Sequence, residues 1–215
     1  MKKQKFSLVE LLVVVAIFGI LSSLLLPSLA NARKTAQASL CKNKLKQIAS
    51  ASFIYSDDND NYAPLNDASN NGYWSARLSQ QGYLPEITAS TSNENSSPYK
   101  CPNGSALVTY YTNNYSQNYR LGHIDENGTT YTAYPLTSTH GNKTVFYMDS
   151  WYVKNTLFKY NLVENKVYDS DDQQAIIRHQ SRANIAYLDG HVSVLTGSQL
   201  LIIGSEANTT EFWIP

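Results

Sequence analysis

The stretch that decides the organisation of this chain is FSLVELLVVVAIFGIL, residues 6–21. Residues 2–5 include three lysines, and no charged side chain occurs between Leu11 and Ala32. About 20 apolar residues in a helix cross the hydrocarbon layer of a membrane, and basic residues before such a segment keep the N-terminus in the cytoplasm. We therefore expect a single-pass protein of a bacterial inner membrane, with its head in the periplasm or at the cell surface.

Glu10 is the one acidic residue at the start of this apolar segment. An ionised carboxylate at the centre of a membrane helix costs about 2.5–3.5 kcal/mol, and less near the interface. From the residues alone two interpretations remain open. Glu10 pairs with a cation, or it extends to the lipid headgroups.

A cleaved secretory signal peptide is the alternative to a membrane anchor, because the lysines, the apolar run and the triplet Ala30-Asn31-Ala32 match its three regions. However, the apolar run is long for a signal peptide, and a helical pattern continues beyond the triplet. Apolar and small side chains recur there at steps of three and four, whereas basic residues lie mostly off this stripe. The stripe consists of Leu40, Cys41, Leu45, Ile48, Ser52 and Tyr55, and the basic residues are Arg33, Lys34, Lys42, Lys44 and Lys46.

These patterns predict one continuous helix of about 50 residues. Residues 6–30 are its transmembrane part and residues 31–56 its amphipathic continuation, with a kink expected at Pro27. Residues 57–72 are rich in Asp, Asn and Gly, so they end the helix.

Residues 6–21 resemble the prepilin-type leader of type IV pilins and type II secretion pseudopilins. The resemblance rests on Phe6 and on the acid at Glu10, four residues further on. Gly19 and Pro27 also lie where that family tends to have Gly and Pro. The resemblance implies that this helix assembles with the helices of other subunits.

The same resemblance implies that residues 1–5 are a leader peptide, removed by a prepilin peptidase between Lys5 and Phe6. Lys5 stands where the family usually has Gly. The new amino group of Phe6 is then methylated, and it supplies a cation with which Glu10 of a neighbouring subunit pairs. The implied partners are the membrane, the peptidase, other pseudopilin subunits and the assembly machinery of a secretion or pilus system.

Residues 57–215 form the extracytoplasmic head, for which the pattern predicts an α+β fold. A short helix is expected within residues 73–84. Strand signals occur at 144–149 and in a hairpin at 184–195, whose Asp189-Gly190 turn is typical of type I′ geometry. We expect the long helix to pack on a small antiparallel sheet, which is also the fold that the pilin resemblance implies.

Asp57, Asp58 and Asp60 are weak candidates for a calcium site. An EF-hand loop needs Gly at the position of Tyr62 and a closing Glu, and this loop has neither. We favour a solvated loop, and we expect no cofactor beyond this weak calcium candidate.

Cys41 and Cys101 are the only cysteines of the chain. Both lie outside the cytoplasm in the expected topology, where disulfides persist. A bridge would close a loop of about 60 residues and stabilise the head by on the order of 4 kcal/mol. Two free buried thiols are the alternative, and we favour the bridge.

His179 and the Asp189-Gly190 pair have nine residues between them. This spacing resembles a large bacterial family of prepilin-like proteins with an H-x9-DG signature of undefined role. The resemblance also rests on Cys41–Ile48, the loop from Tyr55 to Pro64, Cys101-Pro102 and Tyr115–Asn118. We interpret Asp189 as a turn residue and His179 as a hydrogen-bonding residue at the entry to a strand.

Several histidines and acids of the head are possible members of a metal or acid–base site. They have no compact ligand spacing, the chain has no common hydrolase, nucleotide or dinucleotide motif, and nothing in their spacing predicts that they converge. These residues are His123, His140, His179, His191, Asp149 and Asp189.

Charge is divided along the chain, because residues 1–46 carry eight basic and one acidic side chain, against nine and sixteen in the remainder. An acidic head disfavours nucleic-acid binding. The leading hypothesis is a structural filament subunit without enzymatic activity. One alternative is a membrane-tethered module that binds a ligand such as a polysaccharide through its Tyr- and Trp-rich head. The other is a tethered enzyme that uses His179 and Asp189.

Overall fold

In the computed structural model, side chains are described for residues 7–67, 73–86, 97–102, 114–118, 121, 135–136, 141–150 and 177–200, and the backbone alone for three short strands. The chain divides into two compact units, Met1–Ala36 and Gln37–Pro215. Lys5 and Phe6 lie outside the described residues, so the expected cleavage between them stays a prediction.

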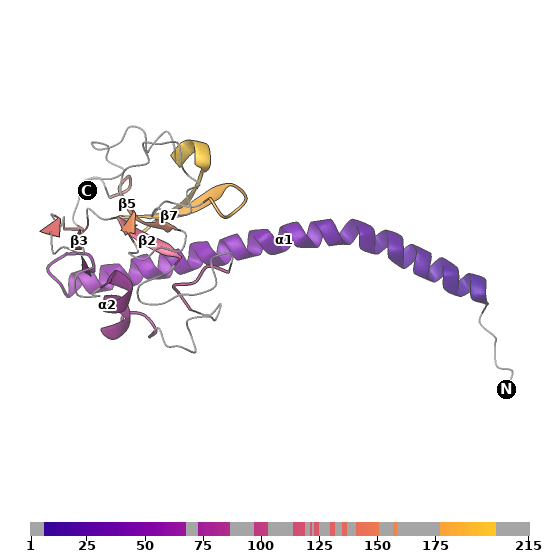
Figure 1. Cartoon of the computed structure of the whole chain (residues 1–215), viewed down its shortest axis with the longest axis horizontal. Coiled ribbons are helices and arrows are strands. Elements are labelled where there is room, and N and C mark those ends of the chain that lie inside the picture. The colour runs from indigo at the N-terminus through magenta and orange to yellow at the C-terminus, as the bar shows by residue number, and fades with distance from the viewer. Residues whose placement is uncertain are drawn as a thin grey trace. The chain divides into compact units, whose positions relative to one another are not determined.

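Helix α1 runs from Leu8 to Asp57 without interruption and has 50 residues, which confirms the predicted single helix (Figure 1). Pro27 lies inside it. An 18-residue window of α1 reaches a mean hydropathy of 2.7, so the helix is long and apolar enough to cross a membrane. Every side chain from Ser7 to Ala36 is exposed in the structure.

The second half of α1 buries the predicted stripe, with two corrections. Cys41, Leu45 and Ile48 are fully buried, but Leu40 is 51% exposed. Successive residues of a helix are rotated by about 100°, so Leu40 lies well away from the centre of the stripe. Lys44, expected off the stripe, is buried at its margin, and its ammonium group donates hydrogen bonds to the carbonyl oxygens of Ser97 (2.8 Å) and Lys100 (2.9 Å).

The head contains a five-stranded sheet in the order β6-β2-β5-β7-β8, in which β2, β5, β7 and β8 are antiparallel and β6 is parallel to β2. A smaller sheet has the order β1-β3-β4, and α2 is a short helix. The predicted α+β class is therefore confirmed. The bounds are β1 Asn66–Asp67, α2 Trp74–Gln80, β2 Tyr115–Asn118, β3 His123–Ile124, β4 Thr130–Tyr131, β5 Val145–Asp149, β6 Leu157–Phe158, β7 Arg182–Tyr187 and β8 Val192–Thr196.

Strand β5 joins the sheet to α1. A β-bulge between Val145 and Tyr147 shifts its register against β7, and both Phe146 and Tyr147 belong to the core cluster that contains the buried stripe of α1. The Tyr147 hydroxyl shares a 2.8 Å hydrogen bond with Ser52, and the Phe146 ring lies 5.3 Å from that of Phe53. A bulge redirects side chains in this way.

The hairpin β7–β8 is confirmed, but its turn is not type I′. The Gly190 N–H donates to the Tyr187 carbonyl (2.9 Å), and the Tyr187 N–H donates to the His191 carbonyl (3.0 Å), which closes a three-residue loop. Gly190 has φ +84°, whereas Asp189 is not among the described residues with positive φ. The loop is therefore the three-residue type in which a glycine follows the turn in the left-handed region.

A turn with type I′ features occurs instead just before β7. Gln180 and Ser181 have φ values of 53° and 63°, and the backbones of His179 and Arg182 exchange two hydrogen bonds of 3.1 Å. Positive φ at both central residues is the mark of this turn type. The turn places His179 opposite the first residue of β7, which confirms that His179 lies at the entry to a strand.

Candidate functional site

The start of α1 is closed by a capping box that the sequence analysis missed. The Ser7 hydroxyl accepts a hydrogen bond from the Val9 N–H (3.3 Å), and the Glu10 carboxylate accepts one from the Ser7 N–H (2.8 Å). The signal was present in the sequence, because Ser-x-x-Glu before an apolar run is the pattern of such a box. Glu10 therefore has a local partner, and its negative charge lies at the favourable end of the helix dipole.

The apolar side chains that follow Glu10 need a partner from outside their own unit. Leu12, Phe18 and Leu25 are between 58% and 66% exposed, and the whole window around them is unburied. Exposed apolar surface of this extent is unfavourable in water. The first unit is therefore suited to lipid or to the helices of other protein chains.

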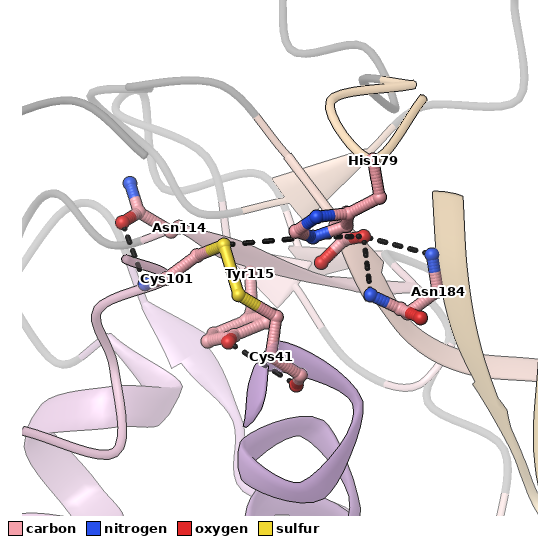
Figure 2. Close-up of polar contacts among 7 residues, drawn as sticks. Cys41, Cys101, Asn114, Tyr115, His179 and Asn184 are labelled. Atoms are coloured by element: carbon pink, nitrogen blue, oxygen red, sulfur yellow. Dashed lines mark hydrogen bonds and ion pairs between the residues drawn. A yellow bond between two sulfur atoms is a disulfide. The ribbon is translucent and has the colours of Figure 1, made fainter. Parts of the chain in front are cut away.

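In the head, Cys41 and Cys101 form the expected disulfide, with Cα atoms 5.2 Å apart. Both residues are fully buried. The Cys101 N–H donates to the Asn114 side-chain oxygen (2.9 Å), and the Tyr115 hydroxyl donates to the Cys41 carbonyl (3.3 Å) (Figure 2). The disulfide thus ties α1 to the segment before β2.

His179 lies directly against this disulfide. Its Nε2 atom is 3.5 Å from Cys101 Sγ and 3.5 Å from a carboxylate oxygen of Asp149. The same oxygen of Asp149 accepts hydrogen bonds from the Asn184 backbone (2.7 Å) and side chain (3.0 Å). Figure 2 marks the contact of His179 with the disulfide by a dashed line. We call Cys41, Cys101, Asp149 and His179 the disulfide–histidine cluster.

His179 and Asp149 do converge, contrary to the sequence-based expectation. Asp149 ends β5 and His179 precedes β7, and these strands are neighbours in the sheet. Met148 pairs with Ile185, so Asn184 is brought beside Asp149. Sequence spacing contains no sign of this pairing, because residues 150–178 separate Asp149 from His179 along the chain.

Burial dominates the protonation of the cluster. It raises the pKa of Asp149 to about 6, although the Arg178 charge and the Asn184 hydrogen bonds act in the other direction. Burial lowers the pKa of His179 to about 4, and the Arg178 charge lowers it further. At neutral pH the carboxyl is therefore mostly ionised and the imidazole neutral. The charge of Arg178 favours the ionised carboxylate, although the three guanidinium nitrogens of Arg178 are buried without a hydrogen-bond partner among the described residues.

Asp189 and Gly190 serve the hairpin and do not join the cluster. Asp189 accepts hydrogen bonds from the backbone N–H of His191 (3.0 Å) and contacts its ring Nδ1. The His191 ring stacks on Tyr187 at 4.2 Å. A Cβ atom added to Gly190 would lie 3.5 Å from the Phe53 ring of α1. The described contacts of the Asp-Gly pair are thus those of a turn, and Asp189 pairs with His191 and not with His179.

The three aspartates after α1 do not converge. Asp57 is the last helical residue, Asp58 accepts a 2.8 Å hydrogen bond from the Tyr83 hydroxyl, and Asp60 lies in the left-handed region with φ 52°. Within the described part of the chain, the side chains that come close enough to share a metal ion are Cys41, Cys101 and His179. The side chain of His123 and all of His140 lie outside the described residues.

A groove of about 520 Å³ lies along the solvent-facing side of α1 in the head. It combines amide and hydroxyl groups with one aromatic ring and one lysine. Its lining residues are Asn43, Lys46, Gln47, Ser50, Ala51, Ile54, Tyr83 and Leu84.

The fold and these sites define an α+β protein with a long apolar N-terminal helix and with a buried disulfide that contacts a polar cluster at the ends of β5 and β7. Comparison with protein-family models, with curated proteins and with solved structures found no match to this chain.

Proposed function

We propose that the protein is a pilin-like structural subunit of a type II secretion or type IV pilus-like filament. It is held in the bacterial inner membrane by α1, with its N-terminus in the cytoplasm and its head outside. A prepilin peptidase cleaves between Lys5 and Phe6. The observation that supports this proposal is the fully exposed apolar half of α1, which has a single carboxylate in its first turn.

The physical basis of the proposal is that the apolar half of α1 moves from one apolar environment to another during assembly. While the subunit is stored, lipid covers the side chains from Leu11 to Ala32. During assembly, helices of neighbouring subunits replace the lipid, so this surface never meets water. Gly19 suits such an approach, because no atom of the described residues lies within 4 Å of the position of an added Cβ atom.

Glu10 specifies the assembly step in this proposal. A carboxylate and a free amine are each costly in an apolar environment, and pairing them lowers that cost. The amine is that of Phe6 on a neighbouring processed subunit. Assembly partners in the cytoplasm and membrane supply the driving force for extrusion, while the head, fixed to α1 by its core and its disulfide, is displayed outside.

The capping box allows a test of the role of Glu10 in assembly, because the charge of Glu10 and the hydrogen bonds of the cap can be removed separately. Glu10→Gln keeps an oxygen that accepts the Ser7 N–H but removes the charge, whereas Ser7→Ala removes the capping hydroxyl and keeps the charge. We expect Glu10→Gln to remain in the membrane without forming filaments, and Ser7→Ala to assemble. Electron microscopy of sheared filaments and membrane fractionation measure both.

The reverse result, with filaments from Glu10→Gln and none from Ser7→Ala, would show that Glu10 acts only as a cap. N-terminal analysis of the mature protein tests processing separately. A methylated Phe6 supports the proposal, whereas a start at Arg33 supports the secretory signal peptide.

The groove along α1 favours a second candidate function, a membrane-tethered module that binds a polysaccharide. Tyr83 provides a ring for stacking on a sugar, and Asn43 and Gln47 provide amide donors and acceptors. Tyr83→Ala should abolish retention on polysaccharide affinity gels if this candidate is correct. Normal filament assembly by the same variant would leave the first proposal intact.

A further inference from the structure

We propose that the basic face of α1 in the head, formed by Lys42 and Lys46, docks against Asp57 at the end of α1 in a second copy of this chain. The second copy lies parallel to the first and is displaced along the helix axis. This inference deepens the proposed filament and rests on it, because it takes from that proposal the shared orientation of all copies in the membrane.

The charges of α1 have no partners on their own helix. Between Glu10 and Asp57 the helix contains five basic residues and no acidic one. A base on a helix surface is stabilised by an acid three or four residues away, and this segment offers none. Among the residues that the structure describes, Lys42, Lys46 and Asp57 make no ion pair. Lys46 and Asp57 are exposed and Lys42 is half-buried, so these charges are available to another chain.

The spacing of the two charges excludes a pair within one copy. Asp57 follows Lys46 by eleven positions, which is close to three full turns of a helix, so both side chains lie on the same side of α1. Along the axis they are roughly 16 Å apart, whereas a salt bridge needs its nitrogen and oxygen within about 4 Å. A parallel copy displaced by this distance brings its Lys46 level with Asp57 of the first.

The orientation of the copies decides between two ways to pair these charges. An antiparallel pair of helices would also bring Lys46 level with Asp57, but its apolar halves would point in opposite directions. Copies inserted in the same sense into one membrane are parallel. A parallel, displaced contact joins different surfaces of the two copies, and repetition of such a contact produces an open filament when it does not close into a ring. This is the kind of assembly that the proposed function requires.

The strength of these contacts suits a register and not an anchor. One exposed salt bridge contributes about 0–1 kcal/mol, so the apolar half of α1 supplies the affinity. Opposite charges at a fixed spacing instead favour one axial displacement over the others. Between the two charges lies Ser50, an exposed small residue in the lining of the groove, which allows a close approach of another helix.

The test uses the full chain in phospholipid vesicles, prepared from equal amounts of ¹⁵N-labelled and unlabelled protein. A carbodiimide joins a contacting amine and carboxylate without a spacer. Mass analysis of the digest should find Lys46 or Lys42 joined to Asp57, with one labelled and one unlabelled peptide in the product. The absence of this mixed product overturns the inference.

Charge reversal tests the pair without chemical modification. Lys46→Glu and Asp57→Lys should each weaken self-association in vesicles about fivefold, the equivalent of about 1 kcal/mol, as measured by energy transfer between copies labelled at the N-terminus. The double variant Lys46→Glu/Asp57→Lys should restore it, because the pair forms again with exchanged signs. Arg182→Glu, at an exposed base of β7, is the matched control and should associate like the parent. A double variant as weak as the single variants contradicts the pairing.

A cysteine at position 50 tests the orientation. Ser50→Cys should give no disulfide-linked dimers, because displacement separates the two copies of this residue by roughly 16 Å. Such dimers would show an antiparallel contact and overturn the inference. It is also wrong if a polysaccharide shields Lys46 from an amine reagent and no inter-chain product forms.

The inference and the proposed function fail separately. Normal filaments without the product between Lys46 or Lys42 and Asp57 overturn the inference and leave the filament proposal intact. The same product in vesicles from a protein that forms no filaments in cells overturns the filament proposal and leaves the contact between copies.

Discussion

The two halves of α1 show opposite relations between hydrophobicity and burial. The first half has the window with mean hydropathy 2.7, yet its side chains from Ser7 to Ala36 are all exposed. The second half interleaves apolar residues with lysine and serine, yet buries a continuous stripe from Cys41 to Ser56. The spacing of apolar residues along the helix, and not their total hydrophobicity, therefore decides which part of α1 is buried within the protein's own fold. The first half is suited to an external apolar solvent, the second to one particular sheet.

The strongest test of this contrast is a matched pair of isoleucines in α1. Ile48 is fully buried and Ile17 is 52% exposed. Ile48→Ala should lower the free energy of unfolding of the head by about 2–5 kcal/mol, because it leaves a cavity. Ile17→Ala should leave it unchanged. Denaturation in detergent, followed by tryptophan fluorescence, measures both, and equal losses would contradict the division of the helix.

The contrast between an exposed and a buried region also holds for ionisable groups, since Glu10 is exposed and Asp149 is buried. Burial changes the pKa values of Asp149 and of its neighbour His179, so the stability of the head depends on pH. The pKa of His179 is lowered to about 4, so stability from its neutral form is lost as the pH falls from 6.5 toward 4. The pKa of Asp149 is raised to about 6, so protonation there adds stability as the pH falls from about 6 toward its ordinary 3.8. The two effects oppose each other in the same pH range.

Asp149→Asn removes the stability that protonation of Asp149 adds at low pH. The variant should therefore reveal the loss of stability that His179 causes as the pH falls. Between pH 7 and pH 4 this variant should lose on the order of 1–3 kcal/mol more unfolding free energy than the parent. Asp57→Asn, at the exposed end of α1, is the control and should follow the parent over this range. Parallel curves for Asp149→Asn and the parent would mean that the carboxyl does not take up a proton in the folded state.

The smallest expected effect concerns two glycines, one in each region. Gly190→Ala should destabilise the head by about 1 kcal/mol, because Gly190 has φ +84° and a side chain there is strained. Gly19→Ala has open space around it and should not change head stability. Thermal unfolding of both variants in detergent would show this difference, and an unaffected Gly190→Ala would argue against the assigned loop.

Local signals predicted the long helix, the α+β class and the hairpin, because each depends on periodicity or on a turn within one segment. The short strands β1, β3, β4 and β6 have two residues each, too few for a periodic pattern to show. Lys44 was misplaced for another reason. Its burial depends on the carbonyl groups of Ser97 and Lys100, which no local pattern reveals.

The same distinction between local and long-range signals applies to the candidate sites. The disulfide was predicted from the presence of two cysteines and from their expected position outside the cytoplasm, and the capping box was readable in Ser7 and Glu10. The contact between Asp149 and His179 could not be predicted from the sequence, because it depends on β5 and β7 becoming neighbours in the sheet. Position in a sheet is a long-range property, and spacing along the chain does not encode it directly.

The Cys41–Cys101 bridge also has a mechanical consequence. If the protein is pulled by its helix and its C-terminus, the covalent path passes through the sulfur atoms and bypasses the chain between them, a sequence separation of 60 residues. At about 3.3–3.6 Å per extended residue, roughly 200 Å of contour length is withheld from extension. A subunit under tension would therefore lengthen far less before rupture, and α2 and β1 would stay outside the line of force.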